Sequence, residues 1–160
     1  MKNRNQIITV AKKTIDTESK AIKNLIDLID DSFADAIEYI YNSNGRVIIT
    51  GIGKSAIIAT KIVATLNSTG TPSIFMHAAD AIHGDLGTIL DDDVVICISK
   101  SGNTPEIKVL VPLIKSRGNK LIAITSNKES FLGEQADFIL NAYVKKEACP
   151  NNLAPTTSTT

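Results

Sequence analysis

The sequence has no excess of either charge. Seventeen lysines and arginines balance seventeen aspartates and glutamates among 160 residues, so the formal net charge is zero. A protein that binds nucleic acid or anionic lipid mainly through charge carries a basic excess, so we expect no nucleic-acid partner. Apolar runs are also short: Val94–Ile98 falls far below the roughly 20 residues of a membrane-spanning helix. We therefore expect no membrane partner.

Cysteine is scarce, with two residues in the chain. Cys97 lies in an apolar run, Cys149 lies among prolines and asparagines, and no CxxC pair is present. The sequence therefore predicts neither a disulfide framework nor a zinc–thiolate site. The N-terminus also lacks the apolar core of a signal peptide, because residues 7–11 form a short stretch broken by Thr9. We expect a cytoplasmic protein.

The apolar content suffices for one compact domain. Apolar residues make up 43% of the chain and charged residues 21%, as in globular proteins. A chain of this length fits one domain, for which roughly 100–200 residues are usual. We expect a single domain over residues 1–160, with an N-terminal helical region at 1–43. Within that region, spacings of three and four residues over 17–43 predict a long amphipathic helix. Its apolar face comprises Ile22, Leu25, Ile26, Ile29, Phe33, Ile37 and Ile40.

After Gly45, apolar strands alternate with helical stretches. We expect strands at 46–50, 73–77, 94–99, 120–125 and 138–144, and helices near 54–68, 104–117 and 131–136. Pro112 predicts a kink in the second of these helices. Strands that are apolar throughout and separated by helices are typical of a parallel sheet covered on both faces. The pattern predicts a doubly wound α/β fold with a mostly parallel five-stranded sheet, whose ligands bind where the strands end.

The first strand is followed by the glycine loop GIGKSA, residues 51–56. Glycines between a strand and a helix leave free amides that favour an anion. A nucleoside triphosphate loop needs a further glycine at the position of Ile48, so that interpretation fails. The GxGxxA pattern of dinucleotide-binding loops is met, but His77 replaces the acidic residue expected after the second strand. In the structural alternative, the glycines only form a tight turn and Lys54 is solvated.

A hydroxyl cluster follows the third strand, in the loop SKSGNT. Ser99, Ser101 and Thr104 surround Gly102 at the start of the next helix. Three hydroxyls at a helix N-terminus can donate hydrogen bonds to a phosphomonoester. A simple helix cap followed by Pro105 needs only one hydroxyl. The loop therefore predicts a phosphate cradle.

Four residues are candidates for acid–base chemistry. His77 and His83 are the two histidines of the chain, and both follow the second strand. Two histidines six residues apart supply few of the ligands that a metal site needs. For His83, the loop position favours a role in acid–base chemistry or substrate contact. Glu106 and Glu147 are the carboxylates best placed for proton transfer. The alternatives are a helix-dipole interaction for Glu106 and an ion pair with a neighbouring lysine for Glu147.

The segments GIGKSAIIATKIVATLNSTGTPSIFMH, HGDLG, SKSGNTPEI and KEACPNNLAPTTSTT resemble the sugar isomerase (SIS) domain of arabinose 5-phosphate isomerases, over about residues 20–160. The resemblance implies a flavodoxin-like fold and an aldose–ketose isomerase that interconverts ribulose 5-phosphate and arabinose 5-phosphate. Such an enzyme needs no cofactor and supplies Kdo biosynthesis for lipopolysaccharide or capsule. The implied partner is a small-molecule sugar phosphate, and the implied assembly is a homodimer or homotetramer.

The resemblance also implies roles for individual residues. Lys54, Glu106, Glu147 and His83 become catalytic, and His77 becomes a position that can take up an inhibitory zinc ion. In the reaction, a glutamate shuttles a proton while Lys54 stabilises the developing oxyanion; which glutamate is the base stays open. The residues implied in binding substrate or phosphate are Gly51, Gly53, Ser55, Gly70, Thr71, Ser99, Ser101, Gly102 and Thr104.

The chain departs from the family pattern in three respects. Family members carry glutamate at the position of Asn103 and a PGE-like segment at residues 78–80. They also continue beyond TSTT with a helix and a further catalytic histidine, and many add paired CBS domains, which are absent from these 160 residues. Two alternatives remain: a noncatalytic sensor of sugar phosphates or nucleotide sugars on the same domain, and an NAD-dependent enzyme.

Overall fold

The computed structural model describes residues 3–160, whose centre is a five-stranded parallel sheet of order β2-β1-β3-β4-β5. The strands are β1 (Val47–Gly51), β2 (Ser73–His77), β3 (Val94–Ile98), β4 (Leu121–Thr125) and β5 (Phe138–Asn141). This arrangement confirms the predicted α/β fold.

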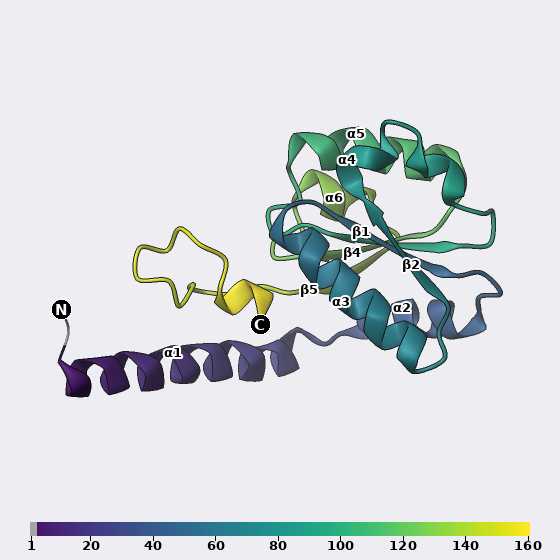
Figure 1. Ribbon diagram of the computed structural model, residues 1–160. Helices are drawn as coiled ribbons and strands as arrows, with labels where there is room; N and C mark the ends of the chain where they lie inside the picture. The colour runs from purple at the N-terminus through teal and green to yellow at the C-terminus, as the bar shows by residue number, and fades with distance from the viewer. Residues whose placement is uncertain (1–2) are drawn as a thin grey trace.

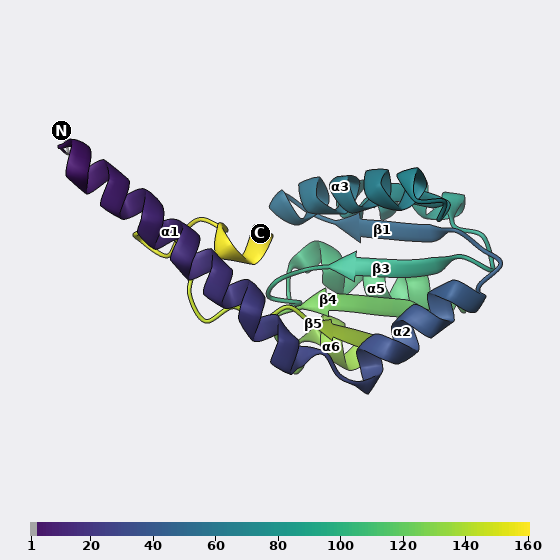
Figure 2. The same cartoon turned by 90° about the horizontal axis from the view of Figure 1, so that it is seen from below.

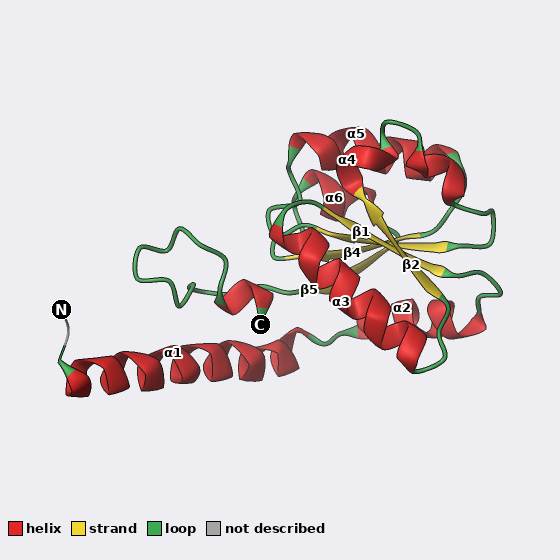
Figure 3. Cartoon of the chain, viewed as in Figure 1, coloured by secondary structure: helices red, strands yellow, loops and turns green. Residues whose placement is uncertain are grey.

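Helices cover both faces of the sheet (Figures 1 and 3). One face carries α2 (Asp31–Asn42) and α3 (Lys54–Ser68), and the other carries α4 (Ala78–Ala81), α5 (Pro105–Ser116) and α6 (Phe131–Gln135). Short 3-10 turns complete the described part of the chain: η1 (Leu25–Leu28), η2 (Asp85–Thr88) and η3 (Thr157–Thr159). The sheet is therefore buried on both sides, as its apolar strands require.

Alternate strand residues supply two hydrophobic cores. Ile48 points to the core beneath α5, where it joins Leu110. Its neighbour Ile49 points to the opposite core, with Ala36 of α2 and Ala59 of α3. All five side chains are inaccessible to solvent. Because each buried isoleucine stabilises the fold by about 1.5–3 kcal/mol, the two cores hold the sheet between its helices.

A buried ion pair fixes the edge of the sheet where β1 and β3 begin. Arg46 Nη2 lies 2.6 Å from Asp93 Oδ2, and the carboxylate also accepts hydrogen bonds from the backbone N–H groups of Arg46 and Leu90. Burial raises the pKa of Asp93, but these hydrogen bonds outweigh burial and place it below its usual value. The charged pair is thus a structural clamp at the edge opposite the expected site.

The N-terminal helix α1 (Arg4–Asn24) extends away from the sheet (Figure 2). The expectation of one helix over 17–43 is wrong in extent. Asn3 and Gln6 form a capping box that starts α1 early, and the Asp30 side chain caps α2 separately by accepting from the Phe33 N–H. No residue of α1 is buried.

One further boundary differs from the sequence-based expectations. The last strand ends at Asn141 instead of residue 144. Pro112 lies inside α5, which is helical on both sides of it, and the predicted kink stays a prediction. Within residues 3–160, no helix combines the length and apolar character needed to cross a membrane.

Candidate active site

The strand order creates a crevice at the carboxyl ends of β1 and β3. From β1 the chain runs through α3 to β2 on one side, whereas from β3 it runs through α5 to β4 on the other. The loops that leave β1 and β3 therefore diverge, and such a switch point is where doubly wound sheets bind ligands. The glycine loop and the hydroxyl loop flank this crevice, as the sequence predicts.

The hydroxyl loop, residues 99–104, forms a tight cradle. Ser99 is buried, and its Oγ accepts a hydrogen bond from the Gly102 N–H at 3.1 Å. The Ser101 Oγ accepts from the Asn103 N–H at 3.3 Å. Within residues 3–160, the buried Thr104 Oγ1 has no hydrogen-bond partner. An unpaired buried hydroxyl costs free energy unless a ligand or water satisfies it, so Thr104 is a natural contact for an anion in the cradle.

The glycine loop brings a second helix N-terminus to the crevice. Gly53 has φ +58°, a conformation that favours glycine, and α3 begins at the next residue, Lys54. At Gly51, a Cβ would lie 3.1 Å from the backbone of Ser55 and 3.2 Å from the Ile98 carbonyl oxygen. Glycine at these two positions lets the helix start close to β3, with its positive end directed to the site.

A cavity of about 480 Å³ lies between these two loops, within the size range of small-ligand pockets. It is lined by Ile52, Lys54, Ser55, Ser99, Lys100, Ser101, Thr104, Ser126, Tyr143, Val144 and Pro155. Five of the predicted site residues, Lys54, Ser55, Ser99, Ser101 and Thr104, are thus brought together. Two ammonium groups and several hydroxyls suit a phosphorylated polar ligand.

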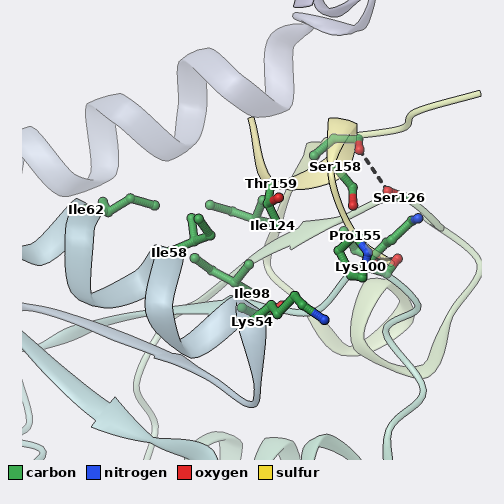
Figure 4. Close-up of a pocket in the computed structure, with 13 residues that line it drawn as sticks. Lys54, Ile58, Ile62, Ile98, Lys100, Ile124, Ser126, Pro155, Ser158 and Thr159 are labelled. Atoms are coloured by element: carbon green, nitrogen blue, oxygen red, sulfur yellow. Dashed lines mark hydrogen bonds between the residues drawn. The ribbon is translucent and has the colours of Figure 1, made fainter. Parts of the chain in front are cut away.

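A smaller apolar cavity of about 130 Å³ lies beside the first (Figure 4). Ile58 and Ile62 of α3 line it together with Ile98 and Ile124 at the ends of β3 and β4. Residues of the C-terminal segment, which we define as 147–160, form its other wall: Pro155, Ser158 and Thr159. Lys54 and Lys100 line both cavities, so the C-terminal segment closes one side of the candidate site.

Glu147 lies at the start of that C-terminal segment and is 4% exposed. Its carboxylate accepts hydrogen bonds from Lys100 Nζ at 2.5 Å, from the Ser158 hydroxyl and N–H, and from the Thr156 hydroxyl and N–H. Burial raises the pKa of Glu147, but these donors outweigh burial and lower it from 4.5 to about 2. Glu147 is therefore an ionised carboxylate held by a lysine from the cradle loop.

All three predicted proton-transfer residues, Glu147 included, lie outside the lining of the large cavity. Glu106 is the second residue of α5, half-buried just beyond Thr104 and close to the cradle in sequence. His83 is exposed in the turn after α4, where its N–H donates to the Asp80 carbonyl. Neither residue lines the cavity that contains Lys54. Their predicted catalytic roles remain predictions.

Gly70 and Thr71 lie at the opposite edge of the sheet from the cradle. Helix α3 starts at the carboxyl end of β1 and runs back, so the residues after it precede β2. There the Pro72 carbonyl accepts from the N–H of Val47, the first residue of β1. One chain therefore does not bring Gly70 and Thr71 to its own cradle, and their predicted role in binding substrate stays a prediction.

His77 ends β2, and its Nδ1 is buried without a hydrogen-bond partner in the described part of the chain. The nearest carboxylate oxygen, Asp80 Oδ2, is 3.8 Å away. Residues 3–160 contain no group of three or more histidine, cysteine, aspartate or glutamate side chains that fits a metal ion. Zinc in proteins usually takes four ligands, so this chain alone does not provide the zinc site that the resemblance implies.

The model of the SIS domain family matches residues 39–160. The chain belongs to the SIS domain family. This SIS chain is 51% identical over 150 residues to a Pseudomonas aeruginosa protein named arabinose 5-phosphate isomerase KdsD, covering 94% of this chain and 46% of that protein. It is 48% identical over 151 residues to a Haemophilus influenzae protein named probable arabinose 5-phosphate isomerase, covering 94% and 45%. The SIS chain thus spans about half the length of these relatives.

A solved SIS structure has the same fold. The structure of an E. coli CFT073 protein in complex with arabinose 5-phosphate superposes with a TM-score of 0.94 at 42% identity. The match covers 99% of this SIS chain and 84% of that chain. Because nearly the whole chain is matched, α1 has a counterpart there in a similar position.

Sequence reasoning missed Lys100. It lies between Ser99 and Ser101 in the cradle loop, lines both cavities and holds Glu147. Its place between two predicted phosphate contacts was the available signal. No local pattern indicated that Lys100 pairs with Glu147, which is 47 residues away in the sequence.

Proposed function

We propose that this chain carries an aldose–ketose isomerase site that interconverts ribulose 5-phosphate and arabinose 5-phosphate. The observation that carries the proposal is the cavity at the switch point, where three cradle hydroxyls face the N-terminus of α3 and Lys54. Its size and polarity suit a five-carbon sugar phosphate. The relatives named arabinose 5-phosphate isomerase support arabinose 5-phosphate as one of the two sugars.

The proposed chemistry moves a carbonyl between C1 and C2. A base removes the proton from the carbon next to the carbonyl, an enediolate forms, and the proton returns to the neighbouring carbon. The cradle holds the phosphate at one end of the cavity. Lys54, at the positive end of α3, stabilises the enediolate oxygen, and Ser55 and the amides of the glycine loop assist.

Glu106, Glu147 and His83 are the proposed proton-transfer groups. A carboxylate with a pKa of about 2 is a poor base near neutral pH, since catalytic bases work best with a pKa near the operating pH. Glu147 therefore needs to lose its lysine partner before it can accept a proton. Glu106 lies two residues after Thr104 and has no lysine partner among the described residues, so both carboxylates stay in the proposal.

We propose that the chain acts as a homodimer or homotetramer through α1. Helix α1 buries no residue and exposes five large apolar side chains. They are Ile7, Ile8, Val10, Ile15 and Ile22. Size-exclusion chromatography with light scattering tests the assembly, and a monomer at micromolar concentration would overturn it.

The proposal also includes a cytoplasmic location, because phosphorylated sugars are charged. It further includes a role in supplying Kdo biosynthesis.

Proton NMR of the purified chain with arabinose 5-phosphate in deuterated buffer, without added cofactor, tests the activity. The expected result is conversion to ribulose 5-phosphate with deuterium entering at C2. Binding without conversion would instead support the sensor alternative. If the chain neither binds nor converts arabinose 5-phosphate, the assignment of the cavity is overturned.

A further inference from the structure

Lys100 joins the cradle loop to the C-terminal segment. Its backbone lies in the cradle loop, and its side chain is 47% exposed and lines the large cavity. Its ammonium group nevertheless contacts the Glu147 carboxylate, which is nearly inaccessible to solvent. One residue therefore belongs to the phosphate cradle by position and to the C-terminal segment by contact.

This contact has no parallel elsewhere in the C-terminal segment. Within residues 3–160, the hydrogen bonds of residues 147–160 otherwise stay inside the segment, and the bond from Lys100 is the one that reaches the rest of the chain. The same segment forms one wall of the apolar cavity. Besides the packing of η3 against α1 and α3, this ion pair is therefore the polar link that holds the wall to the rest of the chain.

Charged groups near Glu147 come from several elements. Lys13 of α1 and Lys146 line a cleft together with Glu147 and Cys149. Lys54 of α3 lines both cavities with Lys100. Among the described residues, however, Lys100 is the only cation within ion-pairing distance of the carboxylate. Its loss would leave Glu147 with hydrogen bonds from Ser158 and Thr156 alone.

We propose that Lys100 is a positioning residue that exchanges partners: it holds Glu147 while the cradle is empty and turns to the phosphate when substrate binds. This inference rests on the proposed function of the cradle. A phosphomonoester carries a charge of about −1.5 to −2 near neutral pH, against −1 for a carboxylate. A half-exposed lysine on a flexible stem can reorient, and the larger charge of the phosphate offsets the loss of the Glu147 pair. The exchange releases the C-terminal segment, whose Pro155 lines the cavity, and leaves Glu147 more basic.

The first experiment follows the Glu147 carboxyl directly and needs no turnover. The chain has six glutamates, so ¹³C labelling of glutamate side chains gives few signals, and the Glu147 signal is identified with Glu147→Gln. Its titration midpoint is measured with and without saturating inorganic phosphate, in wild type and in Lys100→Met. We expect phosphate to raise the wild-type midpoint toward that of Lys100→Met, and to leave the variant unchanged. A wild-type midpoint that phosphate does not move would overturn the proposal.

The second experiment measures hydrogen–deuterium exchange of residues 147–160. We expect Lys100→Met to speed exchange by about tenfold, as for loss of a local closing contact, and phosphate to do the same in wild type. Lys100→Arg should restore wild-type behaviour because it keeps the charge. The matched control is Lys128→Met, because Lys128 is 46% exposed and pairs at 3.0 Å with Asp30 instead of Glu147. Equal exchange in Lys100→Met and Lys128→Met would contradict the proposal.

Turnover separates this proposal from the proposed function. If wild type isomerises arabinose 5-phosphate, Lys100→Met should raise the apparent pKa on the acidic side of the pH profile of kcat/KM, which reports the free enzyme. The apparent pKa on the acidic side of the kcat profile should not change. A shift of the acidic-side pKa in both the kcat/KM and the kcat profile, or in neither profile, would overturn the partner exchange. The isomerase assignment would stand in either case. If wild type shows no turnover, the isomerase assignment fails, while the phosphate titration still decides the exchange.

Discussion

Gly102 approaches Ser130 so closely that a Cβ on residue 102 would lie 1.9 Å from the Ser130 hydroxyl oxygen. The Gly102 carbonyl also accepts from the Leu132 N–H at 3.0 Å, and Gly102 has φ +66°. The cradle loop is therefore shaped by its packing against the N-terminus of α6. This contact, besides the loop sequence, determines where the cradle hydroxyls lie.

Gly102→Ala should lower both stability and ligand affinity. The new methyl group meets Ser130 and requires a conformation that alanine rarely adopts, at a cost of about 1–3 kcal/mol. Chemical denaturation and calorimetric titration with arabinose 5-phosphate measure the two effects. Gly87→Ala is the control, because a Cβ there meets nothing within 4 Å and φ is not positive. Similar stability losses in both variants would refute the packing argument.

Thr104→Val should separate binding from stability. The Thr104 hydroxyl is buried and unpaired among residues 3–160, so a nearly isosteric methyl group should leave the unfolding free energy the same or higher. Sugar-phosphate affinity should fall by about 0.5–1.5 kcal/mol, the net value of one hydrogen bond. Thr104→Ser keeps the hydroxyl and should retain affinity. Unchanged binding of Thr104→Val by calorimetry would remove Thr104 from the cradle.

Glu147→Gln should remove most turnover while leaving sugar-phosphate binding largely intact. The amide cannot accept the proton that the reaction moves, whereas the cradle hydroxyls are untouched. Steady-state kinetics and calorimetry measure turnover and binding separately. Wild-type turnover in this variant would assign the proton transfer to Glu106 or His83.

The same residue predicts acid sensitivity of the fold. The pKa of Glu147 is lowered from 4.5 to about 2, so its ionised form is favoured in the folded chain. Its contribution to stability is complete above about pH 4.5 and is lost as the pH falls toward 2. Denaturation at several pH values should show the gap between wild type and Glu147→Gln narrowing over this range. A gap independent of pH would argue against the ion pair with Lys100.

Arg46→Met should be strongly destabilising. It leaves the Asp93 carboxylate, 2% exposed, without its cation, and breaking a buried pair on one side costs about 3–5 kcal/mol. The control is Lys20→Met, because Lys20 and Asp16 form an exposed pair, which contributes about 0–1 kcal/mol. Urea denaturation gives both values. A small loss in Arg46→Met would mean that the carboxylate is solvated or protonated in the folded chain.

Local patterns in the sequence determined the fold and the location of the site. Helix α3 and strand β2 lie where apolar spacing predicts them, because periodicity reports directly which side chains face the core. The glycine and hydroxyl loops could be assigned to one sheet edge because consecutive parallel strands all end there. The sequence-based prediction started the N-terminal helix too late. The capping box of Asn3 and Gln6 begins α1 at Arg4, where the apolar periodicity is too weak to predict a helix.

Only the tertiary structure decided which distant side chains meet. Lys100 and Glu147 are separated by 47 residues, as are Arg46 and Asp93, and no periodicity relates the partners. The sequence offered neighbouring lysines as partners for Glu147, and the fold supplied one from the cradle loop instead. Likewise, Gly70 and Thr71 lie at the opposite edge because α3 runs back along the sheet. Long-range pairing depends on how loops pack in space, and the sequence pattern carries only the local part of that information.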